Sequence, residues 1–215
     1  MRASLRAVFL TVLVALVAAC GGSGPGDFDP LPRQATVLAF GDSVTHGTGA
    51  GDGEDFPARL GAITGWTIIN DGVPGDDANS ARERLAPGLR EHEPDLVLIW
   101  LGGNDFLSQR EPASVKEDLR VLVGIVRDHG ARPVLLGVPR ASALGAATGR
   151  LQDDPIYREL AREEQVALIE GVLSGVLSER ELRADPVHPN ARGYRRIASE
   201  IAAALDDLGL WLAPG

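Results

Sequence analysis

The stretch Leu96-Val-Leu-Ile-Trp-Leu101, followed directly by Gly102-Gly-Asn-Asp105, indicates the fold of the chain. Its apolar residues are continuous rather than alternating with polar ones, which is typical of a strand buried on both faces of a parallel sheet. Four other runs have the same character: Thr36–Phe40, Trp66–Asn70, Pro133–Val138 and Val166–Ile169. The sequence therefore predicts five strands in one parallel sheet.

Helical patterns separate these strands. The clearest covers Ala113–Asp128, where apolar residues recur every three or four positions, as on a helix packed on one side. Gly130 follows and is expected to end this helix, because glycine readily adopts the left-handed cap conformation. The other helical stretches are Asp55–Ala62, Asp77–Glu91, Pro155–Glu164 and Pro189–Leu208, the last with proline in its first turn. Alternation of strand and helix predicts an α/β fold, a three-layer α/β/α sandwich with right-handed crossovers, as a single domain over residues 35–215.

The first twenty residues precede this domain and are typical of an export signal. Arg2 and Arg6 stand before an apolar run from Ala7 to Ala19. At 1.5 Å per residue this run spans about 20 Å, short of the roughly 30 Å hydrocarbon core of a bilayer. A basic start and a short apolar stretch that ends in small residues instead describe a signal peptide, which we place at residues 1–19.

Cys20 ends this segment and is the single cysteine of the chain. The segment Leu16-Val-Ala-Ala-Cys20 resembles a bacterial lipobox, in which the cysteine is lipidated and becomes the new N-terminus. We therefore expect lipidated Cys20 to begin a glycine-rich, flexible tether over residues 20–34 and to hold the exported protein at a membrane surface of the cell envelope. Gly21 after the cysteine resembles outer-membrane sorting, where the host has an outer membrane. A plain secretory signal is the alternative.

The composition limits the partners of the chain. Its 215 residues are 44% apolar and 24% charged, which excludes a collagen-like, low-complexity or disordered chain. The net charge of −9 is opposite to the basic stripe that a nucleic-acid binder needs, so no nucleic-acid partner is expected. Without a second cysteine, the mature domain cannot form an internal disulfide. The sequence does not indicate a cofactor or an oligomeric state.

Polar motifs follow three of the predicted strands and precede the last helix. Their segments are Phe40–Gly47, Asn70–Asp76, Leu101–Asp105 and Asp185–Asn190. Each by itself reads as a turn or a helix start. Ligands of parallel sheets bind beyond the carboxyl ends of the strands, however, and these motifs meet at that edge. Together they predict one functional site.

Three of these residues suit nucleophilic catalysis. The hydroxyl of Ser43 is a weak nucleophile unless a base takes its proton, and His188 has an imidazole suited to that exchange. Asp185, three residues before His188, is expected to reach the other ring nitrogen and to favour the imidazolium that forms during attack. No Gly-x-Ser-x-Gly elbow surrounds Ser43, because Thr45 stands where the second glycine would be. The sequence therefore predicts a serine hydrolase on a fold other than that of the α/β-hydrolases.

These motifs resemble those of the SGNH (GDSL-type) hydrolase superfamily, from Ala35 to the end of the chain. The nearest likeness is to small bacterial acyl-CoA thioesterases, lysophospholipases and arylesterases. The resemblance implies a flavodoxin-like sheet and an acyl-enzyme mechanism on a small-molecule ester or thioester. It also implies an oxyanion hole made by the backbone N–H groups of Ser43 and Gly75 and the side-chain amide of Asn104. Val44 and Pro186 depart slightly from the usual pattern without removing a reacting group.

Other functions remain alternatives. A carbohydrate O-acetylesterase of the envelope would use the same chemistry, and a non-catalytic envelope lipoprotein would keep only the fold. A two-metal phosphoesterase typically carries an early Asp-x-His pair and further late histidines. Here Val44 stands where the histidine would follow Asp42, and no second histidine accompanies His188. No metal site is therefore expected.

Several neighbouring residues carry weaker expectations. Asp42 is expected to hold its turn through backbone hydrogen bonds, and Asp76 and Asp77 to begin a helix. The run Arg82–Arg84 is read as a solvated helix face. Residues after strand ends are candidates for lining an acyl or alcohol pocket: Phe106, Leu107 and Arg140.

Overall fold

The computed structural model describes residues 28–140 and 149–213. Within these ranges, five parallel strands form one sheet in the order β2-β1-β3-β4-β5. Their bounds are β1 Thr36–Gly41, β2 Thr67–Gly72, β3 Leu96–Trp100, β4 Arg132–Leu136 and β5 Ala167–Ile169. The predicted five-stranded parallel sheet is confirmed. In this flavodoxin-like order the chain reverses its direction of growth between β1 and β3, which is where such sheets bind ligands.

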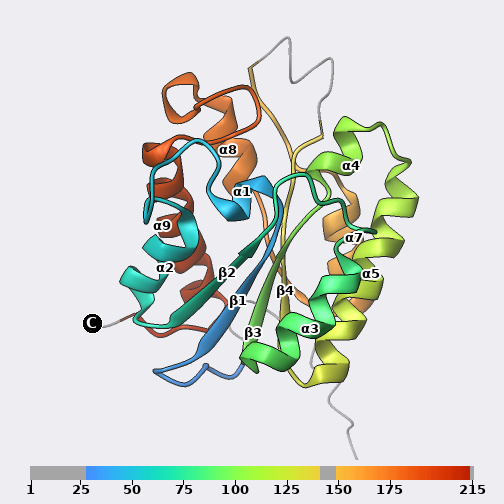
Figure 1. Ribbon diagram of the computed structural model, residues 1–215, viewed down its shortest axis with the longest axis vertical. Coiled ribbons are helices and arrows are strands. Elements are labelled where there is room, and N and C mark those ends of the chain that lie inside the picture. The colour runs from blue at the N-terminus through green and yellow to red at the C-terminus, as the bar shows by residue number, and fades with distance from the viewer. Residues whose placement is uncertain (1–27, 141–148, 214–215) are drawn as a thin grey trace, which may run out of the picture.

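Helices cover both faces of the sheet, so the predicted three layers are also confirmed (Figure 1). One layer contains α2 and α9, with α8 packed against α9, and the other contains α3, α5 and α7. The helical bounds are α1 Ser43–His46, α2 Phe56–Thr64, α3 Arg82–His92, α4 Gly103–Leu107, α5 Pro112–His129, α7 Ile156–Glu164, α8 Val172–Ser178, the 3-10 turn η1 Arg180–Leu182 and α9 Ala191–Asp207.

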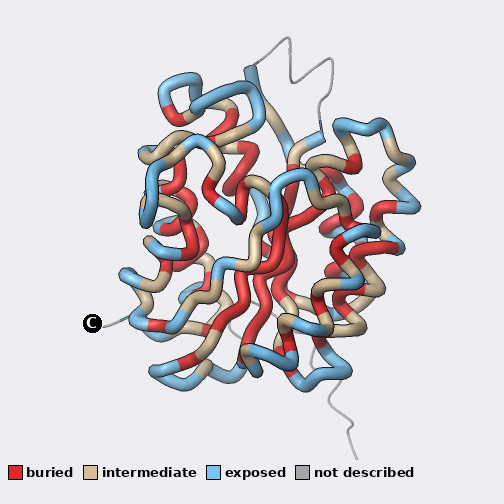
Figure 2. Tube along the Cα trace, viewed as in Figure 1, coloured by how far each residue is buried: buried red, intermediate tan, exposed pale blue. Residues whose placement is uncertain are grey.

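The core lies along the central strands (Figure 2). β1 is buried from Val37 to Gly41, and every residue of β3 is buried, as their apolar runs predict. β2 departs from that prediction because its residues are exposed or half-buried. It is an edge strand with a neighbouring strand on one side only, so its other side is open to solvent.

Helix ends follow local capping chemistry. The apolar stripe of α5 is buried from Val115 to Val126, and Gly130 caps the helix with a φ of +93°, both as predicted. α3 begins later than predicted, at Arg82, because Asp77 accepts hydrogen bonds from the N–H groups of Asn79 and Ser80 and forms a separate turn.

The last helix also begins later than its sequence pattern suggests. α9 starts at Ala191, and Asn190 is its N-cap, accepting from the N–H groups of Arg192 and Gly193. Pro189 therefore lies before the cap and not in the first turn. An asparagine side chain can satisfy N–H groups that have no partner within the helix, which proline cannot do.

The described chain enters the domain at the end of the sheet opposite the carboxyl ends of the strands. The Leu31 N–H donates to the carbonyl of Leu210 over 2.9 Å, and Arg132 at the start of β4 donates to the carbonyl of Asp29. Residues 28–34 of the predicted tether thus lie against the domain. The predicted signal peptide at 1–19 and Cys20 lie outside the described residues. Across residues 28–140 and 149–213, no helix combines the length and apolarity needed to cross a bilayer.

Candidate active site

Ser43 lies directly beyond β1, where the strand gives way to the single turn of α1. Asp42 is the N-cap of this turn, and its Oδ1 accepts from the N–H of Val44 over 2.9 Å. Gly47 ends the turn with a φ of +100°, a conformation that glycine adopts without strain. As the first residue of α1, Ser43 has an N–H group for which the helix offers no carbonyl. The turn therefore presents both the hydroxyl and the N–H of Ser43 at the carboxyl edge of the sheet.

His188 and Asp185 lie in the loop that precedes α9. Oδ1 of Asp185 accepts from the N–H groups of Val187 and His188, each over 2.8 Å, which folds the four residues into a tight turn. The Asn190 side chain holds this turn to the domain by donating to the carbonyls of Glu181 and Arg183. The asparagine that begins α9 thus also fixes the loop that carries the histidine.

The structure brings Ser43, Asp185 and His188 together, although Ser43 and His188 are 145 positions apart. His188 Nδ1 lies 2.7 Å from Oδ2 of Asp185, and its Nε2 lies 3.0 Å from Oγ of Ser43. Because a carboxylate only accepts, it selects the tautomer with hydrogen on Nδ1 and leaves Nε2 free to accept the serine proton. The arrangement can therefore generate a nucleophilic alkoxide at Ser43.

The charge state of Asp185 suits this geometry. Partial burial disfavours its ionised form, but hydrogen bonds from the His188 side chain and from the N–H groups of Val187 and His188 outweigh that effect. The pKa of Asp185 is therefore below its ordinary value. The carboxylate remains ionised at neutral pH, where it can stabilise an imidazolium.

Two further predicted residues lie at the same edge. Gly75, in the loop after β2, has a φ of +90°, a conformation that a side chain would strain. Asn104, in α4 after β3, donates from Nδ2 to the carbonyl of Asp76 over 2.8 Å. The residue after Gly75 is thus bonded directly to Asn104. Ser43, Gly75 and Asn104 come from the loops after β1, β2 and β3, which are neighbours in the sheet.

Asp42 holds the Ser43 turn, as predicted, and the pKa of its carboxyl group is unusual. Its side chain is buried and its Oδ2 lies 3.5 Å from Nδ2 of Asn104. Burial raises the pKa of Asp42 to about 6, against the lowering effect of the hydrogen bond from Val44. The loop after β1 therefore contains a carboxyl group that titrates close to neutrality.

An apolar pocket of about 140 Å³ adjoins these groups. Gly103 beside Asn104 lines one part, and Pro186 and Val187 beside His188 line another. The rest of the lining is Phe106, Leu107, Val138, Pro139, Leu151, Leu173 and Leu177. Phe106 and Leu107 are therefore pocket residues, as expected. Arg140 is not among the residues that line this pocket, and its Nε lies 3.0 Å from Oδ2 of Asp154.

The reading of Arg82 and Arg84 as a solvated face is wrong. Arg82 contacts the carboxylate of Asp118, and Arg84 contacts those of Asp71 and Asp76. Asp76 therefore pairs with Arg84 instead of starting a helix. A signal was present in the sequence: Asp71 and Asp76 lie within thirteen positions of Arg84, in the segment Asn70–Asp76 that is expected at the carboxyl edge of the sheet.

The sequence and the fold both resemble known hydrolases. The model of the GDSL-like Lipase/Acylhydrolase family matches residues 39–196. The thioesterase 1/protease 1/lysophospholipase L1 of Escherichia coli (strain K12) is 30% identical over 181 residues, which cover 80% of this chain and 84% of that protein. An arylesterase of Vibrio mimicus is 30% identical over 175 residues, covering 79% and 87%. The crystal structure of TesA superimposes with a TM-score of 0.72 at 28% identity, covering 80% of this chain and 99% of the other.

Proposed function

Because the chain belongs to the GDSL-like lipase/acylhydrolase family and is a serine ester hydrolase, we propose that it cleaves carboxylic esters or thioesters through an acyl-enzyme on Ser43. The observation that carries this proposal is the position of the His188 ring, 2.7 Å from Asp185 and 3.0 Å from Ser43. The enzyme is of the arylesterase, lysophospholipase or acyl-CoA thioesterase type.

The reaction has two halves. Ser43 Oγ attacks the carbonyl carbon while its proton passes to His188 Nε2, and the carbonyl oxygen becomes an oxyanion. Collapse of this intermediate breaks the bond to the alcohol or thiol, which leaves with the proton from His188. Water then attacks the acyl-enzyme with His188 again as the base, releasing the carboxylic acid and restoring Ser43. Donors for the oxyanion are the N–H groups of Ser43 and Gly75 and the amide of Asn104.

The apolar pocket supports an acyl group as its occupant. It adjoins Gly103 and Val187, so it opens next to the residues that surround the reacting carbonyl. Its volume of about 140 Å³ is below the 300–1,000 Å³ usual for drug-sized ligands. We therefore place short acyl chains in it and expect p-nitrophenyl butyrate to be cleaved with a higher kcat/KM than the palmitate ester. Its leucine and valine walls favour this substrate over a sugar, which needs polar partners.

The test of the mechanism is covalent labelling by a fluorophosphonate. The probe should label the wild-type chain and fail to label Ser43→Ala, and hydrolysis of p-nitrophenyl butyrate should be lost in parallel. Ser199→Ala is the matched control, because Ser199 is an exposed helical serine in α9. Equal labelling of the wild type and Ser43→Ala, or no labelling of folded wild-type protein, would overturn the proposal.

Anchoring through Cys20 is the corresponding proposal for location. Eight residue steps separate Cys20 from Phe28, which reach at most about 28 Å when extended. Phe28 packs against the domain at the end of the sheet opposite Ser43, beside the start of β4. An anchor at Cys20 would therefore direct the site away from the membrane that holds it, toward soluble esters of the envelope. Mass analysis of the mature N-terminus and release of Cys20→Ser from membranes test this arrangement.

A further inference from the structure

Arg84 links the ends of β1 and β2 to the loop that follows β2. From the first turn of α3, its Nη2 donates to the carbonyl of Gly41 over 2.7 Å. Its Nη1 donates to the carbonyl of Asp71 over 2.9 Å and lies 2.8 Å from the carboxylate of the same residue. Its Nε donates to the carboxylate of Asp76 over 2.5 Å. The guanidinium also lies 4.0 Å from the ring centre of Phe40.

Two of these contacts, those to Gly41 and Asp76, lie near proposed oxyanion donors. Gly41 ends β1 two residues before Ser43. Asp76 directly follows Gly75, so the ion pair with Arg84 fixes the peptide next to the Gly75 backbone. The carbonyl of Asp76 in turn accepts from the amide of Asn104 over 2.8 Å. One guanidinium therefore contacts Gly41, which is two residues before Ser43, and Asp76, which follows Gly75 and is bonded to Asn104.

We propose that Arg84 is a positioning residue that sets the geometry of the oxyanion hole, an inference that rests on the proposed function. Its fixed fork of donors holds Gly41, Asp71 and Asp76 in one relative arrangement. Holding Asp76 orients the Asn104 amide, because one N–H of that amide is bonded to the Asp76 carbonyl. The other N–H makes only a long contact of 3.5 Å to Asp42, which a substrate oxyanion replaces.

The surroundings of Arg84 explain why another cation would do this poorly. Its side chain is 23% exposed, and two of its acceptors are backbone carbonyls that need donors in separate directions. A lysine ammonium carries the charge on one atom and cannot span Gly41, Asp71 and Asp76 together. Burial raises the pKa of Asp71 even though Arg84 lowers it, so loss of the guanidinium would also leave acidic groups crowded together.

The experiment compares Arg84→Lys with the matched control Arg120→Lys. Arg120 also contacts several carboxylates, but it lies between α5 and α7, away from the site. With p-nitrophenyl butyrate, Arg84→Lys should lower kcat and kcat/KM together by about 10- to 100-fold, with KM within twofold of the wild type. That pattern indicates loss of an interaction made in the transition state. Arg120→Lys should leave kcat unchanged.

The outcomes separate this inference from the proposed function. Wild-type protein that is not labelled at Ser43 by a fluorophosphonate would refute the function itself. Labelled wild type with an unchanged kcat in folded Arg84→Lys would refute the role of Arg84 alone, as would a rise in KM at constant kcat. Where Arg84→Lys does not fold, Asp76→Asn removes the ion pair and keeps the backbone carbonyl. Folded Asp76→Asn should show the same fall of kcat at constant KM, and a wild-type kcat there would overturn the inference.

Discussion

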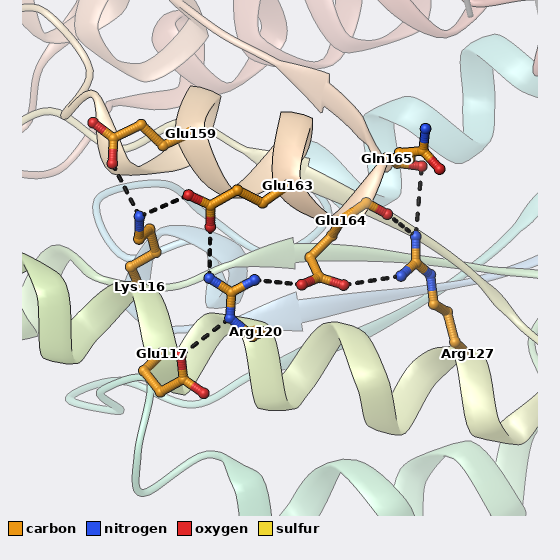
Figure 3. Close-up of polar contacts among 8 residues, drawn as sticks. All are labelled: Lys116, Glu117, Arg120, Arg127, Glu159, Glu163, Glu164 and Gln165. Carbon is orange, nitrogen blue, oxygen red and sulfur yellow. Dashed lines mark hydrogen bonds and ion pairs between the residues drawn. The ribbon is translucent and has the colours of Figure 1, made fainter. Parts of the chain in front are cut away.

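Two of the regions in which arginine contacts carboxylates, the α5–α7 surface and the surroundings of Arg84, differ in what the contacts hold. The α5–α7 network joins two neighbouring helices on the outer surface (Figure 3) and consists of Lys116, Glu117, Arg120, Arg127, Glu159, Glu163 and Glu164. Arg84 instead holds Gly41, Asp71 and Asp76, which lie at strand ends and in loops. Helices already packed through apolar side chains need little help from ion pairs, whereas the loop after β2 lies beyond the hydrogen-bond ladder of the sheet and depends more on such contacts.

The two regions also differ in how far their side chains are buried. In the α5–α7 network the side chain of Glu163 is 46% exposed, so water and salt compete for its partners. At the site, the side chain of Asp76 is 17% exposed and Asp42 is buried. Hydrogen bonds from Arg120 and Lys116 lower the pKa of Glu163, while burial raises the pKa of Asp42 to about 6. Carboxylates in contact with arginine at the surface thus keep a lowered pKa, whereas burial raises the pKa of a carboxyl group at the site.

Apart from the loss of the nucleophile in Ser43→Ala, the largest effect should come from Asn104→Ala at the site. Loss of one oxyanion donor elsewhere lowers kcat by about 10²–10³, and we expect that range here with the fold retained. Steady-state kinetics and near-ultraviolet circular dichroism measure the two quantities. An unfolded variant, or one with undiminished kcat, would contradict the assignment of Asn104.

Asp42→Asn should reveal the cost of burying a carboxylate. The pKa of Asp42 is about 6 in the folded state, whereas its ordinary value, which applies to the unfolded state, is 3.8. The free energy of unfolding of the wild type therefore falls as pH rises between these two values. Two pKa units correspond to about 3 kcal/mol. Asparagine also caps helices well. The Tm of Asp42→Asn relative to the wild type should therefore rise from pH 4 to pH 7, and a difference that does not change with pH would contradict the burial argument.

Glu163→Gln in the α5–α7 network should change stability with pH in the opposite direction to Asp42→Asn. The pKa of Glu163 is lowered in the folded state, so its contribution is present above about pH 4.5 and is lost as pH falls through the folded pKa. Relative to the wild type, the variant should melt at a lower temperature at pH 7 and at the same temperature near pH 3. Thermal melts across this range measure the difference. A deficit that persists in acid would show that packing, and not charge, is responsible.

A double-mutant cycle tests whether Arg84 acts through Asn104. In the Asn104→Ala background, Arg84→Lys should lower kcat only a few-fold, because the donor that it orients has already been removed. Arg120→Lys should have no effect on kcat in either background. Strictly additive losses of kcat for Arg84→Lys and Asn104→Ala would show that Arg84 does not act through Asn104.

The smallest effect should follow from Arg120→Gln. Exposed ion pairs contribute little, so we expect the Tm to fall by no more than about 3 °C at low salt. The difference should shrink in 0.5 M NaCl because salt screens exposed charges. The kcat of Arg120→Gln should be unchanged, in contrast to that of Arg84→Lys. A fall in kcat would show that the α5–α7 network also supports the site.

Long apolar runs and periodic stripes were readable from the sequence, and short elements were not. α1, α4 and α8 have four to seven residues, too few for a helical period to repeat. The late start of α3 is not visible in the helical pattern, because the side chain of Asp77 favours a turn over a helix there. The contacts of Arg84 are not visible in the helical pattern for a related reason. Periodicity shows which face of a helix points away from the core, but not that the loop after β2 lies against that face.

The sequence alone determined the parallel sheet, its helical layers and the edge at which Ser43, Gly75, Asn104, Asp185 and His188 meet. It could do so because burial on both faces of a strand and right-handed crossovers leave few ways to connect such elements. Tertiary structure decided the 3.0 Å approach of His188 to Ser43, the contacts of Arg84 and the raised pKa of Asp42. These depend on loops brought together from distant positions and on water excluded by the whole surrounding shell, neither of which is encoded in a local pattern.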